Sequence, residues 1–179
     1  MTMIRTPFFA FPLTLLLFIC SSQASADEKS AIAAIESAGG SVRVIAQDSD
    51  NKEAAFHLSG KDLKDDGLGN LKEVKNLIWL NLRSTQITDA GLAQLSEIKT
   101  LTRLHLELTN VTDAGMAHLK SLENLEYLNL YGTKVTNAGL GYLKGLKKLK
   151  RLYLWQTEVS KEGVEALTAS LPDLYINRG

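Results

Sequence analysis

Residues 77–100 read LIWLNLRSTQITDAGLAQLSEIKT, and the next two stretches of the same length repeat this pattern. Residues 101–124 read LTRLHLELTNVTDAGMAHLKSLEN, and residues 125–148 read LEYLNLYGTKVTNAGLGYLKGLKK. The shared frame is L-x-x-L-x-L-x-x-T-x-[VI]-T-D-A-G-L, followed by apolar residues every three positions. Because one such unit cannot bury its apolar face alone, a period of 24 residues indicates a stack of repeated units.

Each copy of the frame predicts one strand followed by one helix. The L-x-x-L-x-L segment alternates with period two, which is typical of a short strand whose leucines point inward. Thr88, Thr112 and Thr136 are well placed to cap the N-terminus of a helix, and Asp89 and Asp113 are favourable in its first turn. The spacing of three that follows suits a short α-helix or 3₁₀ segment. We expect the glycines of the frame where neighbouring backbones approach too closely for a side chain: Gly91, Gly115, Gly139 and Gly163.

The end copies are degenerate, as a stack requires where its ends meet water. A first copy occupies residues 53–76, with Phe56 and Leu58 on two of the strand leucine positions. The last copy opens at Leu149 and loses the frame at Ser160, and a short strand is expected over residues 174–176. Residues 27–52 lack the frame and predict an N-terminal cap. It consists of a helix with a stripe of Ala31, Ile32, Ile35 and Ala38, ended by Gly39 and Gly40, and a strand in SVRVIA.

The frame resembles that of leucine-rich repeat proteins, and its T-D-A-G-L variant is similar to the 24-residue repeats of exported bacterial members. The resemblance covers about residues 53–176, within a repeat domain assigned to residues 53–179 that holds about five copies. It implies an α/β fold, a short curved solenoid with parallel strands on the concave face and short helices on the convex face. Thr85, Thr109, Thr133 and Thr157 stand where many members carry Asn. Since a hydroxyl can still bond a neighbouring backbone, we expect a threonine ladder rather than a lost fold.

The N-terminus predicts a secretory signal peptide over residues 1–26. Arg5 precedes the apolar run PFFAFPLTLLLFIC, and the segment ends in Ala24-Ser25-Ala26, a small-residue cleavage site. We therefore expect export to the periplasm or the extracellular space after cleavage near Ala26. One alternative is a retained anchor, although the apolar run is short for a span of about 20 residues. Another is a lipoprotein signal at Cys20, although Ile19 stands where a lipobox has a small residue.

Composition excludes several classes of function for the processed chain. Cys20 is the only cysteine, so the chain after cleavage has no disulfide, catalytic thiol or Cys-ligated metal. It carries 19 basic and 20 acidic residues, which argues against bulk nucleic-acid binding. His57 and His105 lie two repeats apart, about 10 Å, which is too far to share a metal ion. We expect no cofactor and no metal. The basic run 144–151 could meet an anionic surface, but most of it falls in a turn and favours a solvated edge.

Ligand specificity must come from strand positions that point away from the core. Three columns of such positions follow from the frame. The first column, at position 3 of each copy, holds Trp79, Arg103, Tyr127 and Arg151. The second column, at position 5, holds His57, Asn81, His105, Asn129 and Tyr153. The third column, at position 7, holds Ser59, Arg83, Glu107, Tyr131 and Trp155. Both tryptophans of the chain lie here, and exposed Trp, Tyr and Arg dominate binding hot spots.

The sequence therefore predicts a non-enzymatic binding module that recognises a protein or peptide of unknown identity through its concave face. Five or six strands give a flat footprint of about 400 Å², against about 800 Å² per partner in a standard interface. The alternative is a structural or accessory envelope scaffold, whose aromatic columns only stiffen the sheet, for example through a cation–π ladder around Arg103. His105 and Glu107 could form an acid–base pair, but an open surface without an activated nucleophile argues against a hydrolase.

Overall fold

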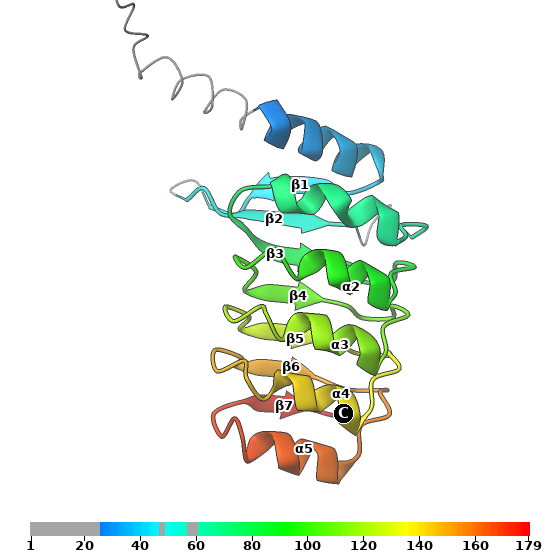
Figure 1. Ribbon diagram of the computed structural model, residues 1–179, viewed down its shortest axis with the longest axis vertical. Helices are drawn as coiled ribbons and strands as arrows, with labels where there is room; N and C mark the ends of the chain where they lie inside the picture. Colours follow the sequence, from blue (N-terminus) through cyan, green and yellow to red (C-terminus); the bar gives the residue numbers. More distant parts are fainter. Residues whose placement is uncertain (1–25, 47–48, 57–60) are drawn as a thin grey trace, which may run out of the picture.

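The computed structural model describes residues 26–46, 49–56 and 61–179, which form one seven-stranded sheet with the strands in chain order (Figure 1). Strands β2 to β7 are parallel, whereas β1 pairs with β2 in the antiparallel sense. The strands are β1 (Ser41–Val44), β2 (Lys52–Ala55), β3 (Leu77–Asn81), β4 (Arg103–His105), β5 (Tyr127–Asn129), β6 (Arg151–Tyr153) and β7 (Tyr175–Asn177). The antiparallel β1 is the one departure from the predicted parallel sheet.

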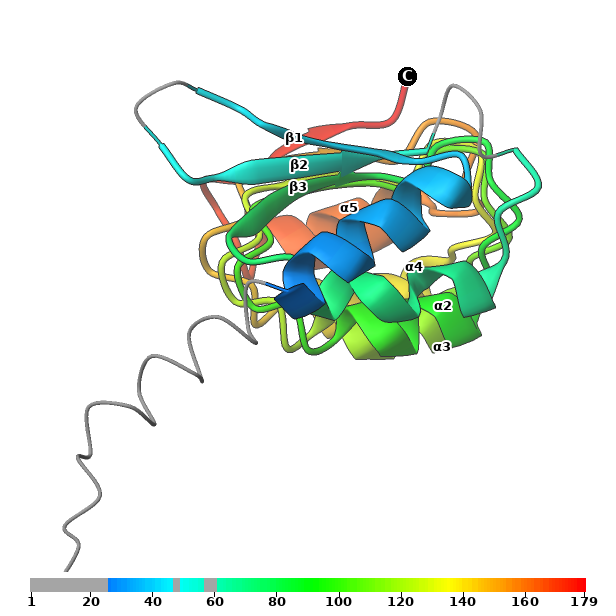
Figure 2. The ribbon, with the colours of Figure 1, turned by 90° about the horizontal axis from the view of Figure 1, so that it is seen from above.

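The helices all lie on one side of the sheet, as seen from the end of the stack in Figure 2. The chain is helical over residues 26–37, and one helix or 3₁₀ segment then separates each pair of parallel strands, except that α4 and η2 follow one another. These elements are η1 (Asp65–Glu73), α2 (Asp89–Leu95), α3 (Asp113–Leu119), α4 (Asn137–Leu140), η2 (Gly141–Leu143) and α5 (Lys161–Thr168). The predicted α/β repeat solenoid is confirmed.

The core is the stack of framework residues between the two layers. Leu80, Leu104, Leu128 and Leu152 pair in register on β3 to β6 and are fully buried. The period of 24 residues is therefore the register of the sheet itself. Since each repeat leaves a hydrophobic edge for the next, the ends need covering. Ala31 and Ile35 of the N-terminal helix are buried at the β1 end of the stack, where Ile35 and Phe56 pack closely around Gly40.

The predicted helix caps are present, and the aspartates of the frame also bond the cap residue of the following repeat. Thr112 accepts a hydrogen bond from the Ala114 N–H at 3.3 Å, as Thr88 and Thr136 do from the equivalent alanines. The carboxylate of Asp89 accepts bonds from the backbone N–H of Thr112 at 2.8 Å and from its hydroxyl at 2.7 Å. Asp65 and Asp113 bond the caps of their following repeats in the same way. The aspartate of one repeat thus holds the cap of the next.

This contact corrects the prediction for the frame glycines. A Cβ at Gly91 would lie 2.5 Å from Oδ1 of Asp65, and a Cβ at Gly115 or Gly139 would meet Asp89 or Asp113 still more closely. The group that requires glycine is therefore the aspartate side chain of the preceding repeat, and not a neighbouring backbone. The prediction was wrong about the partner because the sequence period does not show which side chain crosses between repeats.

The frame threonines bond the backbone, as predicted, but within their own repeat. The buried hydroxyls of Thr85, Thr109 and Thr133 donate to the carbonyl three residues earlier at 2.6, 2.7 and 2.7 Å. Thr157 does the same at 2.6 Å. Each closes the turn after its strand, so threonine replaces asparagine there without leaving a buried polar group unbonded.

The first copy of the repeat is out of the predicted register by two residues. Ala54 pairs with Leu80 and Ala55 pairs with Asn81, whereas the frame placed Phe56 and His57 in those positions. A shift of two keeps every side chain on its face, so the alternation in the sequence cannot detect it. Glu53 and Ala55 therefore stand beside Trp79 and Asn81 on the sheet. His57, Ser59 and the expected signal peptide up to Ser25 lie outside the described residues.

Candidate binding face

The side of the sheet that points away from the helices is seen in Figure 2 and is here called the sheet face. On β3, β4 and β5, Trp79 pairs with Arg103 and Arg103 with Tyr127, while Asn81, His105 and Asn129 pair in the next column. The chain beyond the strands keeps this register, since the N–H of Leu106 donates to the carbonyl of Asn129 at 2.9 Å. The structure therefore brings together the residues that the sequence assigned to the first and second columns, apart from His57.

Aromatic rings connect the first and second columns across the strands. His105 lies between Trp79, at 5.9 Å between ring centroids, and Tyr127, at 4.8 Å. Tyr127 in turn lies 5.3 Å from Tyr153. The guanidinium carbon of Arg103 lies 5.4 Å from the Trp79 ring centroid, within cation–π range. The predicted cation–π contact is therefore confirmed on Trp79, and the rings form a continuous, partly buried ladder.

A hydrogen-bonded cluster underlies the middle of the face. Oε1 of Glu107 lies 2.8 Å from Nδ1 of His105 and accepts a bond from Nδ2 of Asn129 at 2.6 Å. Asn129 also donates to the hydroxyl of Tyr127 at 3.4 Å. Glu107 is only 6% exposed, so it is not the accessible acid that its position in the third column predicts. Burial raises the pKa of Tyr127 above its ordinary value, an effect that the nearby Glu107 charge reinforces and the Asn129 bond opposes.

Two hollows lie on either side of the second column. The first hollow, about 440 Å³, is lined by Trp79, Arg103, His105, Glu126, Tyr127, Lys150 and Arg151. The second hollow, about 240 Å³, is lined by Arg83, Glu107, Asn129, Tyr131, Tyr153, Trp155 and Asn177. The stacked rings of Tyr131 and Trp155, 5.2 Å apart, form one wall of the second hollow. All of the predicted site residues except Asn81 therefore line one of these two hollows.

The structure adds residues to the face that the columns omitted. Tyr175 and Asn177 on β7 pair with Arg151 and Tyr153 and so extend the first and second columns by one strand. Counting one more repeat along the frame would have found both. Glu126 and Lys150 lie at the rim of the first hollow and form an ion pair at 2.9 Å. Their positions in the repeat gave no comparable signal, because the residue before a strand can point to either side.

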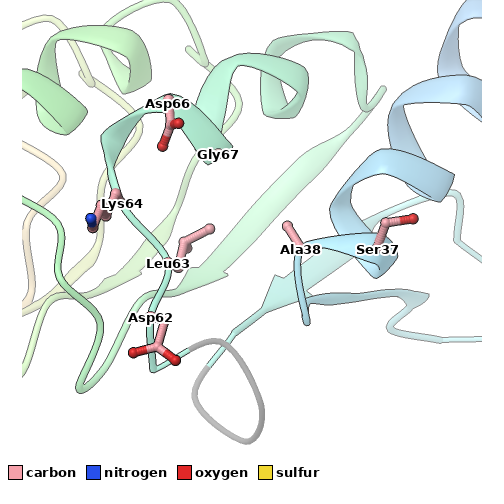
Figure 3. Close-up of a pocket in the computed structure, with 7 residues that line it drawn as sticks. All are labelled: Ser37, Ala38, Asp62, Leu63, Lys64, Asp66 and Gly67. Atoms are coloured by element: carbon pink, nitrogen blue, oxygen red, sulfur yellow. The ribbon is translucent and has the colours of Figure 1, made fainter.

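A larger recess of about 650 Å³ lies away from this face, between the end of the N-terminal helix and the start of η1 (Figure 3). Its lining includes Ser37, Asp62, Lys64 and Asp66, and none of the predicted site residues. The side chains drawn there point in different directions and do not converge on one point. The recess is therefore not a candidate site.

Within residues 26–46, 49–56 and 61–179, no group of three or more His, Cys, Asp or Glu side chains is placed to hold a metal ion. In the same part of the chain, no helix combines the length and the apolar character that a membrane crossing requires.

Comparison with known proteins identifies the repeats. A model of the Leucine Rich repeat family matches residues 75–96 and 98–120. Two of the repeats therefore match the leucine-rich repeat family. No curated protein matches the sequence.

Solved leucine-rich repeat structures share the fold. An internalin (inlC2) from Listeria monocytogenes is 30% identical over 60% of this chain and 44% of its own, with a TM-score of 0.51. Another internalin from the same species (inlF) is 24% identical over 62% of this chain and 30% of its own, with a TM-score of 0.53. The chain thus spans less than half the length of either internalin, and the likeness concerns the solenoid.

Proposed function

We propose that the protein is a non-enzymatic, exported binding module that recognises a protein or peptide through the sheet face. One observation supports this proposal above the others. The residues that recur from one repeat to the next form the core and the helix caps. The strand positions that vary between repeats carry aromatic rings and arginines, which lie around two hollows on one surface. Leucine-rich repeat domains are typical protein-binding modules, and exposed Trp, Tyr and Arg are the side chains that dominate such interfaces.

Accessibility supports the same proposal. Trp155 is 54% exposed and Tyr175 is 57% exposed, although large aromatic side chains of a monomeric domain are ordinarily more buried. The two lie at the β6–β7 end of the sheet face, beside the second hollow and the first column. A bound partner that covered them would remove apolar area from water at about 25 cal/mol per Å².

The aromatic ladder is the observation that supports the alternative function, a structural scaffold. The contacts of Trp79, His105, Tyr127 and Tyr153 stabilise the sheet whether or not a ligand binds. This accounts for the partly buried rings of the first and second columns. It gives no reason for exposed Trp155, or for Arg83 and Arg151, which have no acidic partner among the described residues, so we favour the binding module.

Catalysis is not part of the proposal. His105 and Glu107 do form the hydrogen bond that an acid–base pair requires. However, His105 is held between the rings of Trp79 and Tyr127, and Glu107 is buried beneath the face. The pair is therefore placed to order the ladder and the cluster rather than to reach a substrate. Export rests on residues 1–26 alone, whose apolar run and Ala-Ser-Ala site are those of a signal peptide.

A capture experiment tests the proposal. The chain is immobilised and exposed to the envelope and secreted fractions of its own organism. A sheet-face variant combines Arg103→Ala, Arg151→Ala and Trp155→Ala, all exposed positions whose truncation leaves the core intact. A matched variant on the helix side combines Lys120→Ala, Lys144→Ala and Tyr142→Ala, which are also exposed. Circular dichroism checks that both variants are folded.

The binding module predicts a protein captured by the parent and the helix-side variant but lost by the sheet-face variant. Equal capture by all three would refute the sheet face as the binding surface. Normal secretion of a fusion that carries residues 1–26, and its failure when Ala24 and Ala26 are replaced by bulky residues, tests export separately.

A further inference from the structure

The sheet face is electropositive although the whole chain is neutral. Arg83, Arg103 and Arg151 are exposed, and none of them has an acidic partner among the described residues. Of the acids on this face, Glu53 and Glu107 are 7% and 6% exposed, and Glu126 at the rim of the first hollow is paired with Lys150. Glu53 pairs with Arg43, and Glu107 bonds His105 and Asn129 through Oε1, while its Oε2 is buried without a partner among the described residues. The accessible charge of the face is therefore positive.

The first hollow concentrates this charge. Arg103 and Arg151 lie on either side of Tyr127 in the first column, paired with it across β4, β5 and β6. Two strand spacings separate the arginines, which is about 10 Å between their Cα atoms. The remaining charges of the hollow are Glu126 and Lys150, and they neutralise each other at 2.9 Å. Two arginines without an acidic partner among the described residues thus stand on either side of Tyr127, and the guanidinium of Arg103 lies over the ring of Trp79.

The neutral polar groups of the hollow also offer donors. The indole N–H of Trp79 is buried and has no acceptor among the described residues. The hydroxyl of Tyr127 accepts from Asn129, which leaves its own proton free to donate. Tyrosine keeps this proton at physiological pH because its ordinary pKa is about 10, and burial raises the pKa of Tyr127 further. A ligand that fits these groups carries acceptors and negative charge.

We propose that the first hollow binds an acidic peptide segment, in which two carboxylates three residues apart each pair with one of Arg103 and Arg151. In a polyproline II segment, residues i and i+3 lie on the same side and about 9 Å apart, which matches the spacing of the two arginines. The guanidinium fork binds a carboxylate through two parallel hydrogen bonds. The side chains between the two carboxylates then lie over Tyr127, so the peptide crosses the strands along the stack. This inference rests on the proposed function and specifies its ligand.

An anionic polysaccharide is the main competing ligand. Polyanions with a charge on every unit are bound by runs of basic residues that contact many of those charges. The first hollow offers two unneutralised cations beside an ion pair, and the lysines that follow Lys144 lie at the edge of the stack. There Lys147 and Lys148 bond Ser170 and Asn124. The few, spaced charges therefore favour a peptide with two acidic residues.

Pools of fluorescein-labelled nine-residue peptides test the inference by fluorescence anisotropy with the full protein. One pool has Glu at positions 3 and 6 and mixed residues elsewhere, and two matched pools have Gln or Lys at those positions. The protein variants are Arg103→Glu with Arg151→Glu, and the charge-matched control Lys120→Glu with Lys144→Glu on the helix side. Heparin is the polysaccharide probe. All titrations are run at 50 and 300 mM NaCl, since surface charge pairs weaken with salt.

The parent and the control should bind the Glu pool at least tenfold more tightly than the Gln pool, and more weakly at high salt. The double arginine variant should lose the Glu pool and bind the Lys pool instead, a reversal that misfolding cannot produce. Equal binding of the Glu and Gln pools, no binding of the Glu pool, or binding of heparin alone would overturn the inference. If the captured partner of the sheet face is also retained by the double arginine variant, this inference fails while the proposed function stands.

Discussion

The contact between the aspartate of one repeat and the cap of the next makes a quantitative prediction for Asp89. Its carboxylate accepts two bonds from Thr112, at 2.8 and 2.7 Å, in a partly buried position. Hydrogen bonds to a charged group contribute about 1.5–3 kcal/mol each when buried, and roughly half of that at partial exposure. The acid in the first turn of α2 adds about 0.3–1 kcal/mol. Asp89→Ala should therefore lower the free energy of unfolding by about 2–4 kcal/mol.

The repeat supplies its own conservative control. In the fourth copy Asn137 replaces the aspartate, accepts from the N–H of Ser160 and donates to its hydroxyl, both at 2.9 Å. Asp89→Asn should therefore keep both contacts with Thr112 and cost about 1 kcal/mol, chiefly through the lost charge. Urea unfolding followed by circular dichroism measures both variants.

A double-mutant cycle with Gly115 tests the reasoning itself. Gly115→Ala places a methyl group against Oδ1 of Asp89, so it should displace the carboxylate and cost about as much as Asp89→Ala. With alanine at position 89 the clash disappears, and the same substitution should be nearly neutral, since Ala is favoured over Gly in a helix by about 1 kcal/mol. The coupling energy should reach about 2 kcal/mol. Additive effects within about 0.5 kcal/mol, or an Asp89→Ala cost below that value, would refute the proposed link between repeats.

Three further predictions concern single sites. Gly132 has φ +67° and faces the side chain of Leu108, so Gly132→Ala should destabilise by about 1–2 kcal/mol in urea unfolding, and an unchanged midpoint would contradict the strain. Thr109→Val removes a buried 2.7 Å bond to the Leu106 carbonyl and should cost about 1–2 kcal/mol by the same measurement; a stabilised variant would exclude this role. The raised pKa of Tyr127 means that the folded state holds a proton which the unfolded state releases near pH 10, so its contribution to stability is present below pH 10 and is lost above it. Tyr127→Phe should flatten the fall of stability above pH 10, and an identical fall in both proteins would contradict the assignment.

The sequence was sufficient to predict the repeats because each residue of the frame serves either a local contact or a contact one period away. Leu104 and Leu128 lie one period apart and are therefore neighbours on adjacent strands, and Thr112 caps a helix because its side chain reaches an N–H two residues on. The columns of the sheet face follow from the same period. This is why the sequence alone places Trp79, Arg103 and Tyr127 side by side, as the pairing of β3, β4 and β5 has them.

The errors arose where two arrangements satisfy the same pattern. The first copy can pair in registers that differ by two residues, and only the packing of Phe56 and Ala54 into the core selects between them. The frame positions at 91, 115 and 139 require glycine because an aspartate side chain of the preceding repeat occupies the space that a Cβ would fill. The period of the sequence does not show which side chain this is. Glu107 was predicted to be accessible, but its side chain is buried and its Oε1 bonds His105 and Asn129.

The sequence by itself thus determined the period, the order of strands and helices, the buried leucines and the residues of the three columns, because each depends on spacing along the chain. The tertiary structure alone decided which charges remain accessible. Glu126 forms an ion pair with Lys150, and Glu107 bonds His105 and Asn129. Arg103 and Arg151 have no acidic partner in the described part of the chain. Such pairings depend on side-chain distances of a few ångströms between repeats. A period of 24 residues places the residues on neighbouring strands but does not determine these distances.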